Sequence, residues 1–110
     1  MRLTIPLPPG QEITSYPAIT RDGQTVAYVA RQGTDEAQLY LRDLSSFEPR
    51  AVADSSGALQ PFFSPDGKWV AFFAQSQLQK VEVAGGTPVR VVEVAYPFGG
   101  TWTEDNTIIY

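Results

Sequence analysis

The amino-acid sequence repeats itself with a period of about 40 residues, and this repeat constrains the fold more than any other feature. The first copy is AITRDGQTVAYVA (18–30), the second is FFSPDGKWVAFFA (62–74), and the third is the shorter TWTEDNTIIY (101–110). The segments that follow the first two copies also align with each other, at 38–52 and 77–91. Each copy therefore belongs to one structural unit, and neighbouring units are expected to pack against one another.

The apolar residues fall in short runs separated by Gly, Pro, Asp and Ser, and no stretch keeps a helical period. This pattern predicts β-strands joined by tight turns. The predicted strands are 25–30, 38–44, 68–74, 78–83, 89–94 and 107–110. An all-β repeat of about 40 residues with four strands is typical of a propeller blade.

Each copy carries the same four-residue turn. Its first residue has a hydroxyl that is predicted to bond the backbone N–H two residues on, and its third residue is Asp. The fourth residue is Gly or Asn, which tolerate the left-handed conformation. We interpret these residues as turn formers, because no D-x-D-x-D-G calcium loop is present. They are Thr20, Asp22 and Gly23, then Ser64, Pro65, Asp66 and Gly67, then Thr103, Asp105 and Asn106.

The strand after the second turn is apolar on both of its faces. Trp69, Ala71 and Phe73 lie on one face, and Val70 and Phe72 lie on the other. A sheet with one solvated face would alternate apolar and polar residues. The pattern therefore predicts a sheet that lies between two other sheets.

The composition excludes several classes of function. The 110 residues include no Cys and no His, which rules out Ser-His-Asp and Cys-His catalysis and the usual zinc sites. The net charge of −4 argues against nonspecific binding to nucleic acids, and no apolar run is long enough to span a bilayer. The sequence also lacks a P-loop and a G-x-G-x-x-G motif. We therefore expect a non-catalytic protein with no cofactor and no metal.

The repeats resemble the WD-repeat-like propeller blades of TolB and the tricorn peptidase. SPDGKWVAFFA (64–74), LYLRDL (39–44), TRDG (20–23) and TWTEDNTIIY (101–110) carry the resemblance. The chain looks most similar to the propeller domains that accompany bacterial protein kinases.

The resemblance implies a β-propeller fragment of about two and a half four-stranded antiparallel blades. Residues 1–15 would form a leading outer strand, over 2–7, and a linker. Residues 16–59 and 60–99 would form two blades, and 100–110 the first half of a third.

Such propellers have more blades than this chain supplies, and two explanations stay open. The chain is a piece of a longer protein, or it closes a ring with copies of itself. In either case the isolated chain would expose strand edges and apolar blade faces, so we predict self-association.

In the resembled fold, one face carries the loops that join the second strand to the third and one blade to the next. Here these loops are 31–37, 53–60, 75–77 and 95–100, and the repeated turns project from the opposite face. Loops held by rigid sheets are where binding is expected. The candidate ligand-binding residues are Arg31, Asp35, Glu36, Asp54, Ser55, Tyr96 and Phe98.

These observations favour a non-catalytic scaffold that binds a protein or peptide as part of a larger sensor or signalling protein. The alternative is a propeller that gates access to a serine peptidase. A propeller enzyme or carbohydrate binder is disfavoured, because the innermost strands YPAIT, PFFS and GTWT are nearly free of charge. The residues do not define a compartment, although the resemblance favours an extracytoplasmic one.

Overall fold

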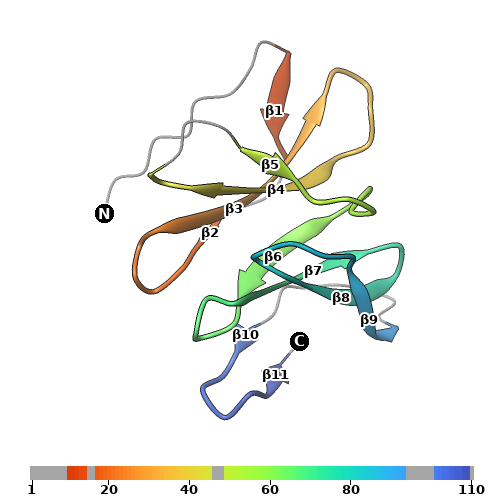
Figure 1. Ribbon diagram of the computed structural model, residues 1–110. Coiled ribbons are helices and arrows are strands. Elements are labelled where there is room, and N and C mark those ends of the chain that lie inside the picture. Colours follow the sequence, from red (N-terminus) through yellow and green to blue (C-terminus); the bar gives the residue numbers. More distant parts are fainter. Residues whose placement is uncertain (1–9, 15–16, 46–48, 94–100, 110) are drawn as a thin grey trace.

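The protein is built from three antiparallel β-sheets that follow one another along the chain (Figure 1). The computed structural model describes residues 10–14, 17–45, 49–93 and 101–109, and these residues contain no helix. The prediction of an all-β chain built from antiparallel sheets is confirmed, and the first, second and third sheets have five, four and two strands. The strands are β1 (Gln11–Ile13), β2 (Ala18–Ile19), β3 (Thr25–Gln32), β4 (Gln38–Asp43), β5 (Arg50–Ala51), β6 (Leu59–Phe63), β7 (Trp69–Ala74), β8 (Gln77–Glu82), β9 (Val89–Glu93), β10 (Thr101–Trp102) and β11 (Ile108–Ile109).

The first sheet has the order β1-β3-β4-β5, and β2 pairs with the same edge of β3 as β1 does. β1 pairs with the end of β3 and β2 with its beginning, so the two short strands together occupy the place of one innermost strand. The sequence assigned residues 11–13 to the leading linker, whereas the structure pairs them with β3. The predicted outer strand over 2–7 lies outside the described residues, and the blade boundaries stay predictions.

The second sheet has its strands in chain order, β6-β7-β8-β9, and the third consists of β10 and β11. A two-residue turn joins β7 to β8, and both of its residues, Gln75 and Ser76, have positive φ angles of 53° and 59°. This backbone is that of a type I′ turn, whose twist matches the twist of the paired strands.

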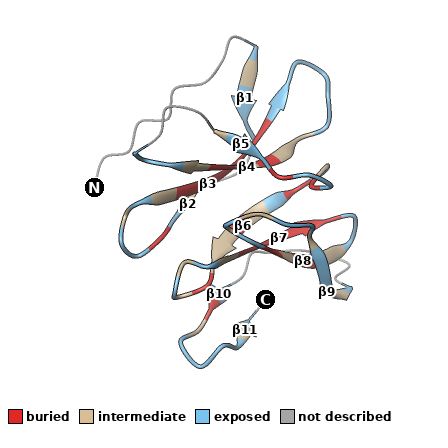
Figure 2. Ribbon diagram, viewed as in Figure 1, coloured by how far each residue is buried: buried red, intermediate tan, exposed pale blue. Residues whose placement is uncertain are grey.

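Two apolar cores hold the three sheets together, and Figure 2 shows the buried residues concentrated in the middle strands. The first core joins the first and second sheets, and the second core joins the second and third sheets. The first contains Ala27, Val29, Leu39, Leu41, Val52, Ala58, Val70, Phe72, Ala74 and Val81. The second contains Ala71, Phe73, Leu78 and Trp102, with Phe62, Trp69, Val92 and Ile108 packed against it.

β7 contributes to both cores, which confirms that this strand is covered on its two faces. Val70 and Phe72 belong to the first core, whereas Ala71 and Phe73 belong to the second. Burial on both faces explains why the strand lacks polar residues, since an unpaired polar side chain there would lose its hydration without compensation.

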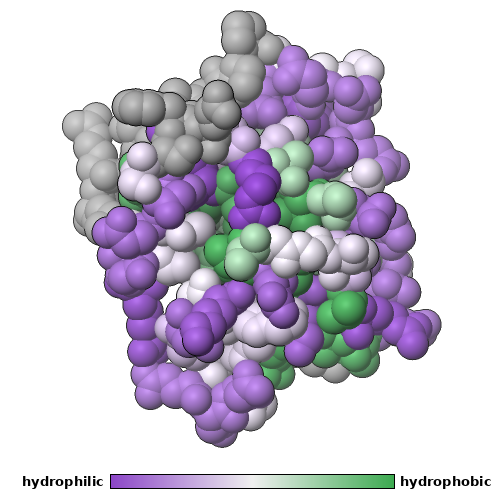
Figure 3. Space-filling model, viewed as in Figure 1, coloured by the Kyte–Doolittle hydropathy of each residue, from purple (hydrophilic) through white to green (hydrophobic). Residues whose placement is uncertain are grey.

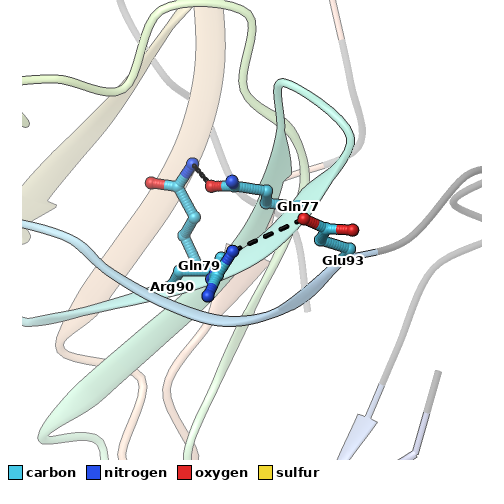
Figure 4. A network of polar contacts seen from close by, with 4 residues as sticks. All are labelled: Gln77, Gln79, Arg90 and Glu93. Atoms are coloured by element: carbon cyan, nitrogen blue, oxygen red, sulfur yellow. Dashed lines mark hydrogen bonds and ion pairs between the residues drawn. The ribbon is translucent and has the colours of Figure 1, made fainter.

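The outer edge of the second sheet is more polar, and it also exposes apolar side chains. Val89 and Val91 of β9 are 49% and 42% exposed, and Figure 3 shows a hydrophobic patch at the lower right, where Figure 1 places β9. Figure 4 shows two polar contacts at this edge. Gln79 Nε2 donates to Gln77 Oε1 (3.4 Å), and Arg90 Nη1 pairs with Glu93 Oε1 (3.5 Å).

Candidate functional site

The three repeated turns share one hydrogen-bond pattern, which the second turn illustrates. The Ser64 hydroxyl donates to Asp66 Oδ1 (2.7 Å) and accepts from the Trp69 N–H (3.0 Å), while Asp66 Oδ1 also accepts from the Lys68 N–H (2.9 Å). The hydroxyl therefore bonds the N–H five residues on, not two residues on as the sequence suggested. The bond to an N–H two residues on is made instead by the Asp66 carboxylate, which accepts from Lys68.

The first and third turns repeat this arrangement with small changes. In the first turn the Thr20 hydroxyl accepts from the Thr25 N–H (3.1 Å), and in the third the Thr103 hydroxyl accepts from the Thr107 N–H (3.2 Å). The third turn is thus one residue shorter. The fourth residues of the turns are all left-handed, with φ angles of 72° for Gly23, 73° for Gly67 and 67° for Asn106.

The carboxylates of the turns are held in their ionised form by these bonds. The Ser64 hydroxyl, followed by the Lys68 N–H, lowers the pKa of Asp66 below its usual 3.8. The Thr20 hydroxyl lowers the pKa of Asp22, and the Thr103 hydroxyl lowers that of Asp105, in the same way. Hydrogen bonds to the charged form of a carboxylate favour that form. Within the described ranges, no three His, Cys, Asp or Glu residues lie close enough to hold a metal ion.

The turns lie against one another on one face of the molecule. A Cβ atom on Gly67 would come within 3.3 Å of Thr20 Cγ2, so the second turn packs closely on the first. Arg21 of the first turn forms an ion pair with Glu104 of the third (2.6 Å). The repeat therefore builds a surface in which all three turns take part.

The predicted ligand-binding residues belong to the other end of the sheets, and they differ in their exposure and in their partners. Arg31 is exposed and pairs with Glu12 of β1 (2.5 Å), so its charge is already neutralised. Asp35, Glu36 and Asp54 are exposed. Tyr96 and Phe98 lie outside the described residues.

Ser55 requires a correction, because it is 1% exposed and cannot meet a ligand at the surface. Its hydroxyl donates to the Val52 carbonyl (2.6 Å) and accepts from the Leu39 N–H (3.0 Å). These bonds satisfy backbone groups at the end of the first sheet, where an unpaired N–H would be costly. Because Ser55 lies in a predicted loop, the sequence did not indicate this structural role.

A cleft of about 490 Å³ that the sequence analysis missed lies on the turn face, between the second and third sheets. Its volume falls within the range of small-ligand sites, roughly 300–1,000 Å³. Two indoles, an ammonium group, carboxylates, hydroxyls and an amide line it. The lining residues are Ser64, Pro65, Asp66, Trp69, Lys80, Trp102, Thr103, Glu104 and Asn106.

Lys80 is held between the two indoles of this cleft. Its Nζ lies 4.8 Å from the centre of the Trp69 ring and 6.0 Å from that of Trp102. The electron-rich ring faces attract the ammonium group. Asn106 Oδ1 accepts from Trp102 Nε1 (2.9 Å), which orients the second indole. No ion pair links Lys80 to a carboxylate within the part of the chain that the structure describes.

The equivalent place in the first repeat shows that this arrangement is not required by the blade. In the alignment of the repeats, Leu41 is equivalent to Lys80 and Thr25 is equivalent to Trp69. Leu41 is 3% exposed and belongs to the first core. A cleft near Leu41 and Thr25 is bridged by Arg50, which donates from its guanidinium group to the Val83 carbonyl. A Lys where the repeat has an apolar residue was the sequence signal that could have revealed the site.

Comparison with known proteins shows the fold. No protein-family model matches the chain. A curated relative, the uncharacterized peptidase YuxL of Bacillus subtilis, is 27% identical over 88% of this chain, and the chain spans 16% of that relative's length.

Solved structures give the same result. An acylaminoacyl peptidase, solved in complex with Z-Gly-Gly-Phe-chloromethyl ketone, matches 87% of this chain with a TM-score of 0.72 and 20% identity. The β-propeller domain of the Trilobed protease from Pyrococcus furiosus matches 87% with a TM-score of 0.71 and 21% identity. A putative TolB from Agrobacterium tumefaciens matches 76% with a TM-score of 0.59 and 26% identity. This chain covers 16%, 32% and 31% of those three chains, respectively. The three sheets therefore have the fold of part of a β-propeller, similar to the propeller domain of the Trilobed protease and to the putative TolB.

Proposed function

We propose that the protein is part of a non-catalytic β-propeller that binds a protein or peptide. The cleft between the second and third sheets carries this proposal, because it combines two indoles and an ammonium group on strands with hydrogen-bonding groups on the adjacent turns. Tryptophan side chains provide a large contact area at a low cost in conformational entropy, and they are frequent at binding hot spots. The absence of His and Cys from the sequence agrees with a binding role, since the usual bases and thiol nucleophiles are missing.

A peptide array tests this proposal with variants that the repeat itself suggests. Trp69→Thr places in the cleft the residue that the first repeat has at Thr25, so the backbone should tolerate it. We expect this variant to bind array peptides about tenfold more weakly than the wild type. A double variant, Asp35→Ala with Glu36→Ala, removes two predicted contacts from the opposite face. Loss of binding only in the double variant would move the site to the loops, and a wild-type protein that binds no peptide would refute the proposal.

A propeller that accompanies a peptidase is the second candidate, and the names of the relatives favour it. YuxL is called a peptidase, and two of the similar structures come from an acylaminoacyl peptidase and a protease. In such a protein the propeller would control which peptides reach a separate hydrolase domain. The reading frame around this chain separates the candidates. A G-x-S-x-G hydrolase sequence downstream supports the peptidase, whereas a kinase and a membrane span upstream support the sensor.

We further propose that the chain self-associates through exposed blade edges. Among the described residues, Val89, Val91 and Ile109 are 42–57% exposed and lie on β9 and β11. Unpaired strand edges with apolar side chains promote association. Size-exclusion chromatography with light scattering should give a mass above that of one chain, and a stable monomer at high concentration would contradict the proposal.

An extracytoplasmic location is proposed on the resemblance to TolB. The described residues contain no helix that is long and apolar enough to cross a membrane. Fractionation of cells that produce the tagged full-length protein would test the location, and recovery in the cytoplasmic fraction alone would contradict it.

A further inference from the structure

We propose that the Trp69–Lys80–Trp102 cleft is a subsite for a peptide carboxylate, either a C-terminus or an acidic side chain. The inference rests on the proposed peptide-binding function and names the chemistry that the cleft recognises.

Lys80 departs from the repeat at a position where an apolar residue packs better. Leu41, the equivalent residue, is almost fully buried against the second sheet. A leucine at position 80 would extend the second core in the same way. Departures from local rules are expected at functional sites.

The ammonium group of Lys80 has no carboxylate partner among the described residues. Lys80 is half-buried and has two ring faces as neighbours, and these faces accept no conventional hydrogen bond. An ammonium group carries three N–H donors. A ligand carboxylate would receive these donors in a place partly shielded from water, where charge-assisted hydrogen bonds are strongest.

Two carboxylates on the rim of the cleft limit the kind of anion that can bind. Asp66 and Glu104 are exposed at the cleft. Asp66 accepts bonds from Ser64 and Lys68, and Glu104 pairs with Arg21, so neither approaches Lys80 as a partner in the structure. Their charges disfavour multiply charged anions such as phosphate. They oppose a single carboxylate less, and they favour a neutral or basic group next to that carboxylate along the ligand.

The indoles complete the subsite. Trp69 is half-buried, so part of its surface is open to the cleft, and Trp102 is fixed by Asn106. An apolar or aromatic side chain next to the carboxylate can pack against these indoles. A peptide that ends in Phe therefore combines both contacts.

The chain has two tryptophans and both line this cleft, so tryptophan fluorescence is sensitive to a ligand bound there. The probes are N-acetyl-Ala-Ala-Phe with a free carboxylate and the same peptide with a C-terminal amide. We expect the carboxylate form to change the fluorescence saturably and to bind about tenfold more tightly than the amide, as a charge-assisted hydrogen bond predicts. Lys80→Met and Lys80→Leu should both reduce the affinity for the carboxylate form to that for the amide. Lys68→Met removes the other lysine of the chain, which is exposed outside the cleft, and should leave the affinity unchanged.

Three outcomes would overturn the inference. Equal affinity of the wild type for the two probes would show that the carboxylate is not recognised, whether or not the variants fold. Equal loss in Lys68→Met would assign the effect to general surface charge. A lack of response to both probes, in a protein that still binds array peptides, would place peptide binding elsewhere. If the array also finds no binding, the proposed function itself fails.

Discussion

The seam between the first and second sheets and the seam between the second and third use equivalent strands, and each has a cleft of about 490 Å³, yet different side chains line the two clefts. In the first seam, Leu41 is buried in the first core, and Arg50 bridges the cleft. In the second seam, Trp69 and Lys80 occupy the equivalent positions and leave a cleft beside the turns. The repeat thus determines where strands lie, while single residues at equivalent positions decide which chemical groups line the cleft of each seam.

The largest expected effect comes from deleting a ring in the first seam. Phe72 is fully buried in the first core, and Phe72→Ala should lower the free energy of unfolding by about 3–5 kcal/mol. Phe73→Ala, its neighbour in the second core, should cost less, toward about 3 kcal/mol, because the short third sheet can move into the space. Urea unfolding measures both variants. A larger loss for Phe73→Ala would contradict the idea that the second seam is the looser one.

Exchanging the equivalent residues tests the comparison directly. Leu41→Lys should lower the free energy of unfolding by about 2–4 kcal/mol, because it removes apolar contacts and places an unpaired charge at a site that is 3% exposed. Lys80→Leu should change the same quantity by less than about 1 kcal/mol in either direction, because replacing a partly buried charge by an apolar residue is often neutral. Similar losses in the two variants would show that Lys80 is needed for stability, which would weaken its assignment to binding.

The repeat made the fold predictable because four turn residues recur where the backbone needs them. A hydroxyl, an Asp and a left-handed Gly or Asn specify a tight turn by local chemistry, so the sheets could be expected before the structure was known. The pairing of residues 11–13 with β3 was not predictable, because this segment is short and has no counterpart in the other repeats.

The candidate site was less predictable, for a physical reason. Loop position alone does not tell whether a polar residue faces solvent or backbone, and Ser55 faces backbone. The cleft depends on contacts between Trp69, Lys80 and Trp102, which come from two different sheets. The sequence shows each residue, but their juxtaposition arises only when the second and third sheets pack.

The second turn offers a smaller test, in which a hydroxyl on the cleft wall supports the turn. Ser64→Ala removes the acceptor of the Trp69 N–H and should cost about 1–2 kcal/mol of unfolding free energy. It should also raise the pKa of Asp66 toward 3.8, since this hydroxyl is the main cause of the lowered value. A carboxylate with a lowered folded-state pKa contributes stability above its unfolded-state value. That contribution is lost as the pH falls through the folded-state pKa, below about 3.8, and the variant should lack this part of the acid dependence.

Ser45→Ala is a matched control for the pKa measurement by NMR. The backbone N–H of Ser45, rather than its hydroxyl, is the main cause of the lowered pKa of Asp43. This variant keeps the N–H, so the pKa of Asp43 should move less than that of Asp66 does in Ser64→Ala. An equal or larger movement would mean that the hydroxyl is not what distinguishes the turn carboxylates.

The smallest expected effect is that of the ion pair between the first and third turns, which spans both seams. Arg21 and Glu104 are separated by 2.6 Å, but their side chains are 68% and 72% exposed. Water and salt screen such a pair, so a double-mutant cycle with Arg21→Ala and Glu104→Ala should give a coupling energy of about 0–1 kcal/mol. The coupling should fall further at 1 M salt. Glu104 also lines the cleft, so Arg21→Ala should alter ligand binding more than stability, by leaving an uncompensated negative charge on the rim. A coupling energy well above 1 kcal/mol that resists salt would mean that the turns form one rigid unit, and the second seam would then be less open than its cleft suggests.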